Sequence, residues 1–156
     1  VTRVPLIVRW PGHAQAGQVC DAFVSHGLDL ARTFCEAAGA PVPATFRGAS
    51  LLPLLQGARE NGRTFICATY HGSQFGLYSQ RMLRERRWKY VWNPTAEDEL
   101  YDLESDPGER HNRAADRSCA GELARLRRAL VGWMEETSDP LLNLWTRTQL
   151  LEGLKV

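Results

Sequence analysis

The sequence predicts an α/β fold class: the end of an α/β domain, then a small four-stranded antiparallel sheet packed against a C-terminal helix. The isolated piece is therefore α+β. Within the β-rich run 4–10, Leu6, Ile7 and Val8 are apolar in succession, which is typical of a strand covered on both faces. Beyond residue 63 apolar residues alternate with polar ones, which is typical of strands with one covered face. Leucines at helical spacing between 118 and 136 predict the helix that covers that face.

The first half of the chain is predicted to contain one strand and two helices. The strand over 4–10 stops at Pro11-Gly12, and an apolar strand at the very start of a chain indicates a piece of a longer protein. Either Ser25 or Asp29 is suited to cap the first helix, which Gly39 ends. Its predicted core stripe comprises Leu28, Ala31, Phe34, Cys35 and Ala38. A short helix is expected over residues 51–55.

The second half of the chain is predicted to carry the sheet. Its strands are expected over residues 64–70, 77–83, 88–92 and 99–103, with a polar turn at 84–87. In the third strand Trp88, Tyr90 and Trp92 share one face, while Lys89 and Val91 share the other.

Ser118 is the predicted cap of the long helix, and its core stripe comprises Leu123, Leu126, Leu130 and Trp133. We therefore divide the chain at the polar turn 59–63. Residues 1–58 finish a large α/β domain, residues 59–140 form a sheet-plus-helix subdomain, and residues 141–156 form an apolar tail.

Composition and charge exclude several classes of protein. The net charge of +1 gives no reason to expect a nucleic-acid partner, and no apolar run has the length of a membrane-spanning helix. The four cysteines form no CxxC pair, which argues against a zinc site. Two of them, Cys35 and Cys67, have apolar neighbours and are expected to be buried thiols, although a disulfide stays open.

The stretch ELYDLESDPGERHNRA, residues 99–114, is rich in carboxylates. Its acidic residues lack the spacing of a twelve-residue calcium loop. Asp106-Pro107-Gly108 is turn chemistry, because proline presets φ and aspartate bonds its own backbone. We therefore expect a solvated, turn-forming segment and no metal ligands there.

Five segments in order resemble the C-terminal part of the sulfatases. They are RVPLIVRWPG (3–12), VSHGLDLARTF (24–34), GASLLPLLQG (48–57), RWKYVWN (87–93) and the acidic stretch 99–114. With His71 and the late ETSDPLL (136–142), the chain looks most like the sulfamidase and heparan-type branch of this alkaline-phosphatase-like superfamily. One departure is Arg32, where the family usually has proline.

The resemblance implies chemistry whose key groups this sequence lacks. Sulfatases attack sulfur with a formylglycine made from a C/S-x-P-x-R motif and hold the sulfate on a divalent cation, usually calcium. No cysteine here is followed by x-Pro, and Ser105 and Ser138, which are, lack the arginine. We therefore expect no catalytic or metal-binding residue in this chain. Formylglycine and calcium are expected in the missing N-terminal part, and the fragment alone should be inactive.

The resemblance also implies a role in the substrate pocket. His71, in a glycine-bounded loop (68–76), matches a histidine near the pocket mouth, with Gln74 as a weaker companion. The alternative is a loop histidine bonded to nearby backbone. The basic run of Arg81, Arg84, Arg86 and Arg87 suits either an acidic glycan or a solvated hairpin.

Three interpretations of function remain. The first is the C-terminal part of a sulfatase that acts on sulfate esters or N-sulfo groups, whose partners are its missing N-terminal domain and a sulfated small molecule or glycan. The second is the same part of a phosphonate or phosphate monoester hydrolase, and the third is a stand-alone binding module. The apolar strand 4–10 and the tail 141–156 favour self-association, unless the tail folds back over the strand.

Overall fold

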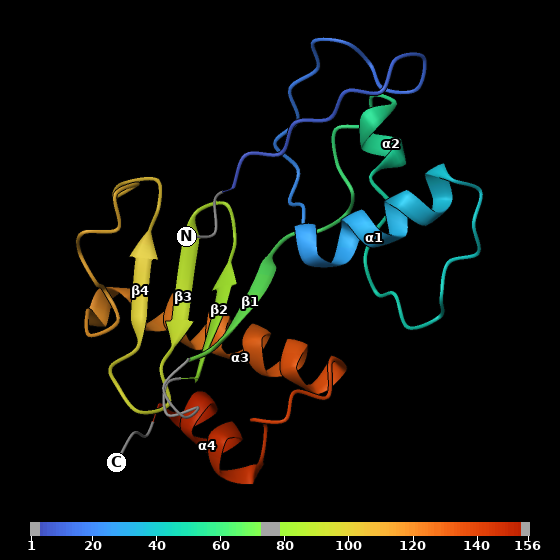
Figure 1. The fold of residues 1–156 in the computed structure, drawn as a ribbon. Helices are drawn as coiled ribbons and strands as arrows, with labels where there is room; N and C mark the ends of the chain where they lie inside the picture. The colour runs from blue at the N-terminus through green and yellow to red at the C-terminus, as the bar shows by residue number, and fades with distance from the viewer. Residues whose placement is uncertain (1–3, 73–78, 154–156) are drawn as a thin grey trace. The chain divides into compact units, whose positions relative to one another are not determined.

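The computed structural model describes residues 4–72 and 79–153. They form two compact units, Val1–Ile66 and Cys67–Val156, which we call the N-terminal unit and the sheet unit. The boundary between them falls at the first residue of strand β1 (Figure 1).

Two helices organise the N-terminal unit, α1 (His26–Ala37) and the short α2 (Leu52–Leu55). The predicted ends of α1 are confirmed, since Ser25 occupies the N-cap position and Gly39, with φ of 66°, follows the C-cap. The cap itself works differently from the prediction. The Ser25 side chain caps nothing, and its backbone N–H instead donates to the carboxylate of Asp29 (2.7 Å).

The Asp29 carboxylate, which has no exposed surface, holds the N-terminal unit together. It accepts a hydrogen bond from the Ala49 N–H (2.8 Å) and two from Arg63, at 2.6 and 2.9 Å. One turn later Thr33 accepts from the Leu51 N–H (2.9 Å), so that helix α1 and the segment leading to α2 are joined by polar contacts.

Gly48 lies where this segment passes α1. A Cβ at that position would stand 2.1 Å from the Leu28 carbonyl oxygen. Only glycine therefore permits this approach of the two backbones.

Two predictions for the N-terminal unit were wrong. Residues 4–10 form no hydrogen-bonded strand, and Ile7 is 91% exposed. The predicted core stripe of α1 faces outward, with Leu28 and Phe34 more than half exposed, while Asp29 and Thr33 are buried. The reason is common to both: an apolar run becomes a strand or a core face only when another element packs on it.

The sheet unit confirms the predicted order of elements. Strands β1 (Ile66–His71), β2 (Ser79–Arg84), β3 (Trp88–Trp92) and β4 (Glu99–Asp102) form one sheet in the order β1-β2-β3-β4. Strand β3 is antiparallel to both β2 and β4, with Leu83 opposite Tyr90 and Tyr90 opposite Leu100. The 3-10 turn η1 (Arg117–Cys119) leads directly into α3 (Ala120–Glu136), and α4 (Leu144–Glu152) follows. Figure 1 shows α3 and α4 on one side of the sheet.

The core of the sheet unit lies between the sheet and α3. Leu83, Tyr90 and Leu100 share the sheet face that α3 covers, and none of them has exposed surface. Val91 is buried too, so the second face of β3 is less open than its alternating pattern predicts. On α3, Met134 is buried and Trp133 only half-buried, which shifts the predicted stripe by one residue at its end.

The start of α3 differs from the prediction as well. Asp116, not Ser118, supplies the cap: its side chain accepts from the backbone N–H of Ser118 (2.9 Å) and from the Ser118 hydroxyl (2.7 Å). A single turn of 3-10 helix therefore precedes the α-helix, and the carboxylate satisfies its first free N–H.

The tail forms α4 and packs on α3. Asn143 and Thr146 make a reciprocal capping box at its start, and Leu150 is buried. Leu144 and Trp145 remain more than half exposed. Packing of α4 on α3 thus buries one leucine of the tail, Leu150, and leaves Leu144 exposed.

All four cysteines are free thiols, and Cys35 and Cys67 are half-buried. Burial raises the pKa of the Cys67 thiol to about 12, so this thiol stays protonated and unreactive at neutral pH. Among residues 4–72 and 79–153, none of the helices combines the length and apolarity needed to cross a lipid bilayer.

Candidate functional site

His71 is the last residue of β1 and lies exposed at one edge of the sheet. Figure 1 shows that β1 ends at the edge where β2 begins and β3 ends. Gln74, its predicted companion, lies outside the described residues. The histidine is thus placed at an accessible edge, where a polar side chain meets solvent.

A buried ion pair stands close to this edge. The guanidinium of Arg81 in β2 donates to both oxygens of Asp139, at 2.6 and 2.9 Å, and both side chains are almost completely buried. Burial opposes the Asp139 charge, but hydrogen bonds from Arg81 and Leu141, together with the charges of Arg81 and His71, hold its pKa below the usual range. His71 therefore lies within the electrostatic reach of this pair.

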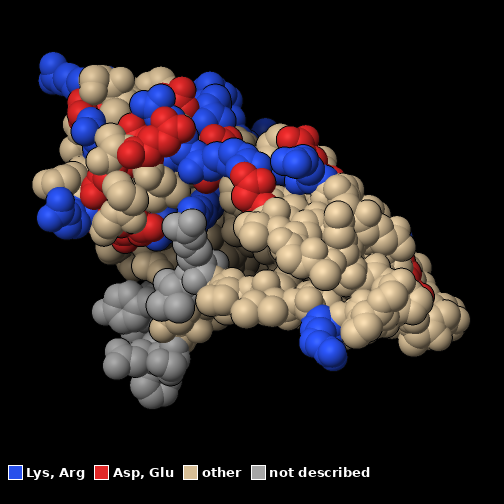
Figure 2. Space-filling model, turned by 90° about the horizontal axis from the view of Figure 1, so that it is seen from above, with Lys and Arg blue, Asp and Glu red and all other residues tan. Residues whose placement is uncertain are grey.

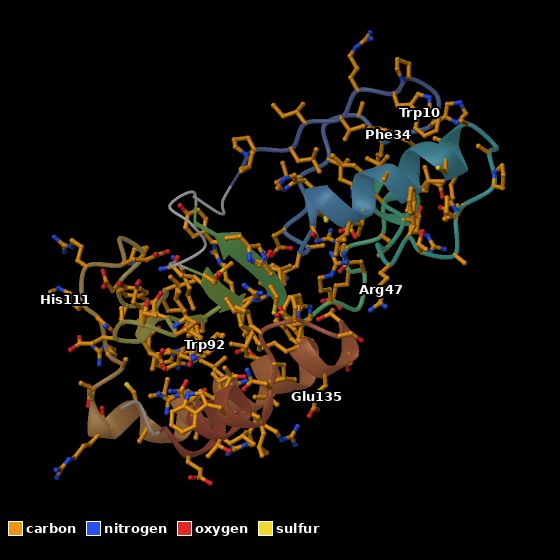
Figure 3. The ribbon with its side chains drawn as sticks, turned by 60° about the horizontal axis from the view of Figure 1, so that its bottom comes forward. Trp10, Phe34, Arg47, Trp92, His111 and Glu135 are labelled. Carbon is orange, nitrogen blue, oxygen red and sulfur yellow. The ribbon has the colours of Figure 1, made fainter. Side chains whose placement is uncertain are left out.

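Amide and carboxylate side chains continue along the same edge. Gln80 donates to the Asn93 side chain (2.5 Å), which donates in turn to Glu99 (3.3 Å). Figure 3 shows Trp92 among the side chains crowded between the strands and helices α3 and α4, and its indole N–H has no hydrogen-bond partner. The edge is therefore polar at its surface and apolar directly beneath.

The structure separates the four arginines of the basic run. Arg81 is 1% exposed and neutralised by Asp139, so both predictions for it, glycan contact and solvated hairpin, were wrong. Arg87 pairs with Asp102 (3.0 Å) and lies over the Trp88 ring (5.1 Å), in keeping with a structural hairpin. Arg84 is half-buried, and its Nε has no hydrogen-bond partner.

The acidic stretch forms turns, as predicted, but it is only partly solvated. Asp106 is buried and its carboxylate accepts the backbone N–H groups of Arg110 and His111, both at 2.8 Å. Glu109, at φ of 54°, pairs with Lys89 (2.5 Å). These carboxylates hold protein cations and amides, and within the described ranges no three His, Cys, Asp or Glu side chains are grouped to hold a metal ion.

Sequence reasoning missed two of the buried aspartates, Asp29 and Asp139. Asp139 is followed by proline in Ser138-Asp139-Pro140, and Asp29 is the one acid in the apolar run HGLDLA. An acid flanked by apolar residues was the available signal in HGLDLA, because a buried carboxylate must find donors. The partners, Arg81 and Arg63, are 58 and 34 residues away in the chain, and no local pattern identifies them.

Comparison with known proteins places this fold in a family. The family described as "N-sulphoglucosamine sulphohydrolase, C-terminal" matches residues 1–136. A Delta 4,5-hexuronate-2-O-sulfatase of Bacteroides thetaiotaomicron is 33% identical over 148 residues, which cover 92% of this chain and 31% of that relative. The chain thus spans a quarter to a third of the length of this relative and of two further curated sulfatases that it matches.

Solved structures agree with this placement. A 2-O GAG sulfatase superposes with a TM-score of 0.65 at 32% identity, over 83% of this chain and 26% of the other. A phosphonate monoester hydrolase from Silicibacter pomeroyi superposes with a TM-score of 0.73 at 26% identity, over 87% of this chain and 29% of the other. The sequence match over residues 1–136 and the four-stranded sheet with its covering helix lead to one conclusion: the chain belongs to the sulfatase family, whose C-terminal domain it matches.

Proposed function

We propose that this chain is the C-terminal part of a sulfuric-ester or N-sulfo hydrolase, in which it supports the fold and lines part of the substrate pocket without performing the chemistry. The observation that carries this proposal is the match of residues 1–136 to the C-terminal family of N-sulphoglucosamine sulphohydrolase. Relatives that act on sulfated hexuronate and N-acetylglucosamine, by their names, support a sulfated saccharide as the substrate.

Residues 1–58 complete the large α/β domain in this proposal. Leu28, Phe34 and the apolar segment 4–8 are exposed in the N-terminal unit, and Figure 2 shows a broad uncharged surface over this part of the molecule. Apolar surface of that kind marks a contact with another part of a protein. The segment 4–10 becomes a strand when the preceding domain supplies neighbours to pair with it.

The calcium ion and formylglycine of the family belong to the N-terminal part of the parent. The residues here do not fit them: the buried carboxylates of Asp29, Asp98 and Asp139 already bind arginine side chains. No step of hydrolysis is therefore assigned to this chain.

A test with the purified chain addresses the catalytic part of the proposal. We expect no release of phenol from an aryl sulfate or an aryl phosphonate, with or without added calcium, because a nucleophile and metal ligands are both needed. Turnover above a buffer blank that survives repurification would refute this. Joining the chain to its preceding domain should restore activity on one of the two substrates.

That restored activity also decides between two chemistries. The phosphonate monoester hydrolase of Silicibacter pomeroyi has the higher TM-score of the two structures compared, 0.73 against 0.65. This observation keeps phosphonate or phosphate monoester hydrolysis as the second candidate. The ratio of kcat/KM for the sulfate and phosphonate substrates distinguishes the candidates directly.

His71 is the proposed contact with the substrate pocket, with Gln74, three residues later in the sequence, as a weaker companion. In the intact parent we expect His71→Ala to raise KM for the natural sulfated substrate at nearly constant kcat, which is the sign of lost ground-state binding. His111→Ala is the matched control, because His111 is an exposed histidine on the acidic loop (Figure 3). Equal kinetic constants for both variants and the parent would remove His71 from the pocket.

A further inference from the structure

The face of the sheet turned away from the α3-covered side carries two cations directly opposite each other. Arg84, the last residue of β2, pairs in register with Lys89 of β3. These positions alternate with Leu83 and Tyr90, which face the core, so the two cations share the other face. Like charges opposite each other across two strands repel, so a neighbouring anion stabilises the arrangement.

The neighbouring carboxylates are already engaged. The Glu109 carboxylate forms an ion pair with the Lys89 ammonium (2.5 Å), which also lies 5.7 Å from the centre of the Tyr101 ring. Glu85, next to Arg84 in the chain, binds both terminal nitrogens of Arg125 at 2.7 Å. No carboxylate among these neutralises Arg84.

Glu99, on the same face, has its own donors. It accepts from the Tyr101 hydroxyl (2.9 Å) and from the Asn93 amide (3.3 Å). Its two oxygens thus bond to Asn93, which follows β3, and to Tyr101 of β4, away from the end of β2 that carries Arg84.

Arg84 is left with an unmet donor. Its Nε has no solvent-exposed surface and, in the described part of the chain, no hydrogen-bond acceptor, although the residue as a whole is partly exposed. A buried charged donor without an acceptor is unfavourable, and a guanidinium matches an anion that offers two oxygens to adjacent N–H groups. The partly exposed Arg84 side chain therefore offers a guanidinium edge whose buried Nε still lacks an acceptor.

We propose that Arg84 binds a sulfate group of a sulfated saccharide. The identity of the ligand rests on the proposed function, since a sulfated glycan is the anionic partner that function supplies. Arg84 and Gln80 lie near the two ends of β2, and their Cα atoms are roughly 13 Å apart, the length of four residues of extended strand. The sulfate bound there belongs to a different sugar from the one at the His71 edge, so the site selects for chain length and sulfation pattern.

The test is a binding measurement on the chain itself. A sulfated heparin tetrasaccharide and its desulfated counterpart are titrated by calorimetry at low and moderate salt. We expect binding of the sulfated probe, at least tenfold weaker binding by Arg84→Gln, and binding within twofold of the parent chain by Arg128→Gln, which removes an exposed arginine of α3. Arg84→Lys should recover part of the loss, because it keeps the charge without the Nε donor.

Three results would overturn the proposal. They are no binding of the sulfated probe, equal binding of the desulfated probe, and equal losses in Arg84→Gln and Arg128→Gln, which indicate general charge attraction. Amide NMR spectra of each variant show whether the sheet is intact, and Arg84→Lys serves if Arg84→Gln does not fold. Hydrolysis by the intact parent is measured separately, on a monosaccharide sulfate too short to reach Arg84. Failure there refutes the proposed function and leaves the binding result to be judged by itself.

Discussion

Replacing Asp29 by asparagine removes the charge at the centre of the N-terminal unit while keeping the shape of the side chain. The carboxylate accepts hydrogen bonds from Ser25, Ala49 and both terminal nitrogens of Arg63, at 2.6 to 2.9 Å. An asparagine side chain offers one oxygen and places an NH₂ group where the other oxygen accepted. At least one donor then faces another donor, and Arg63 loses its counter-charge.

The expected loss of stability is about 3 kcal/mol. Removing one partner of a buried ion pair costs roughly 3–5 kcal/mol, because a charge is left without compensation. The lower end applies here, because the Arg63 side chain is 21% exposed and regains some hydration. A loss of this size corresponds to local opening more than a hundredfold more frequent, at about 1.4 kcal/mol for each factor of ten.

Native-state hydrogen exchange measures this opening where it occurs. The Ala49 and Leu51 amides bond to Asp29 and Thr33, so they report on the N-terminal unit alone. We expect both to exchange more than a hundredfold faster in Asp29→Asn. Glu60→Gln is the control, since Glu60 is an exposed acid of the same unit and its replacement should leave both rates unchanged.

The same carboxylate predicts an acid transition. Burial opposes the Asp29 charge, but hydrogen bonds from Arg63, Ser25 and Ala49 hold its pKa below the usual range. The contribution of the ionised Asp29 carboxylate to the stability of the N-terminal unit is therefore complete above about pH 4. It is lost as the pH falls through the lowered pKa. The protection of the parent chain should fall over this window and that of Asp29→Asn much less. Exchange in Asp29→Asn within fivefold of the parent at neutral pH would refute this account of the N-terminal unit.

Three further predictions follow from contacts that only the folded chain makes. Gly48→Ala should destabilise the N-terminal unit by about 2 to 3 kcal/mol in urea unfolding, because its Cβ would meet the Leu28 carbonyl oxygen at 2.1 Å. Gly132→Ala is the control: open space surrounds that position, so the change should stabilise α3 by up to about 1 kcal/mol. Asp139→Asn should cost about 3–5 kcal/mol, more than Asp29→Asn, because Arg81 is only 1% exposed and cannot regain hydration; a smaller cost than that of Asp29→Asn would contradict this reasoning. The exposed apolar surface of the N-terminal unit should make the isolated chain self-associate, so light scattering should give a mass that rises with concentration, whereas 17.6 kDa at every concentration would exclude it.

The sheet unit was largely predictable because its signals are local. Alternation of apolar residues identified β2, β3 and β4, and each observed strand begins within two residues of its predicted start. Leu123, Leu126 and Leu130 gave the buried face of α3. The family resemblance rested on segments of both units, and the match of residues 1–136 confirms it. For the candidate site, sequence supplied His71 and Gln74, whose role in the pocket stays a prediction.

The sequence by itself thus determined the order of the elements, the turns at Gly39 and Pro107, and the family, since each depends on residues close together in the chain. Only the tertiary structure decided which charges are paired: Asp139 with Arg81 and Asp29 with Arg63, while Arg84 Nε has no partner among residues 4–72 and 79–153. It also decided that the apolar segment 4–10 forms no strand. The physical reason is the same in each case. A strand, a buried charge and a buried donor depend on partners that the fold brings from distant parts of the chain, and local propensity does not identify those partners.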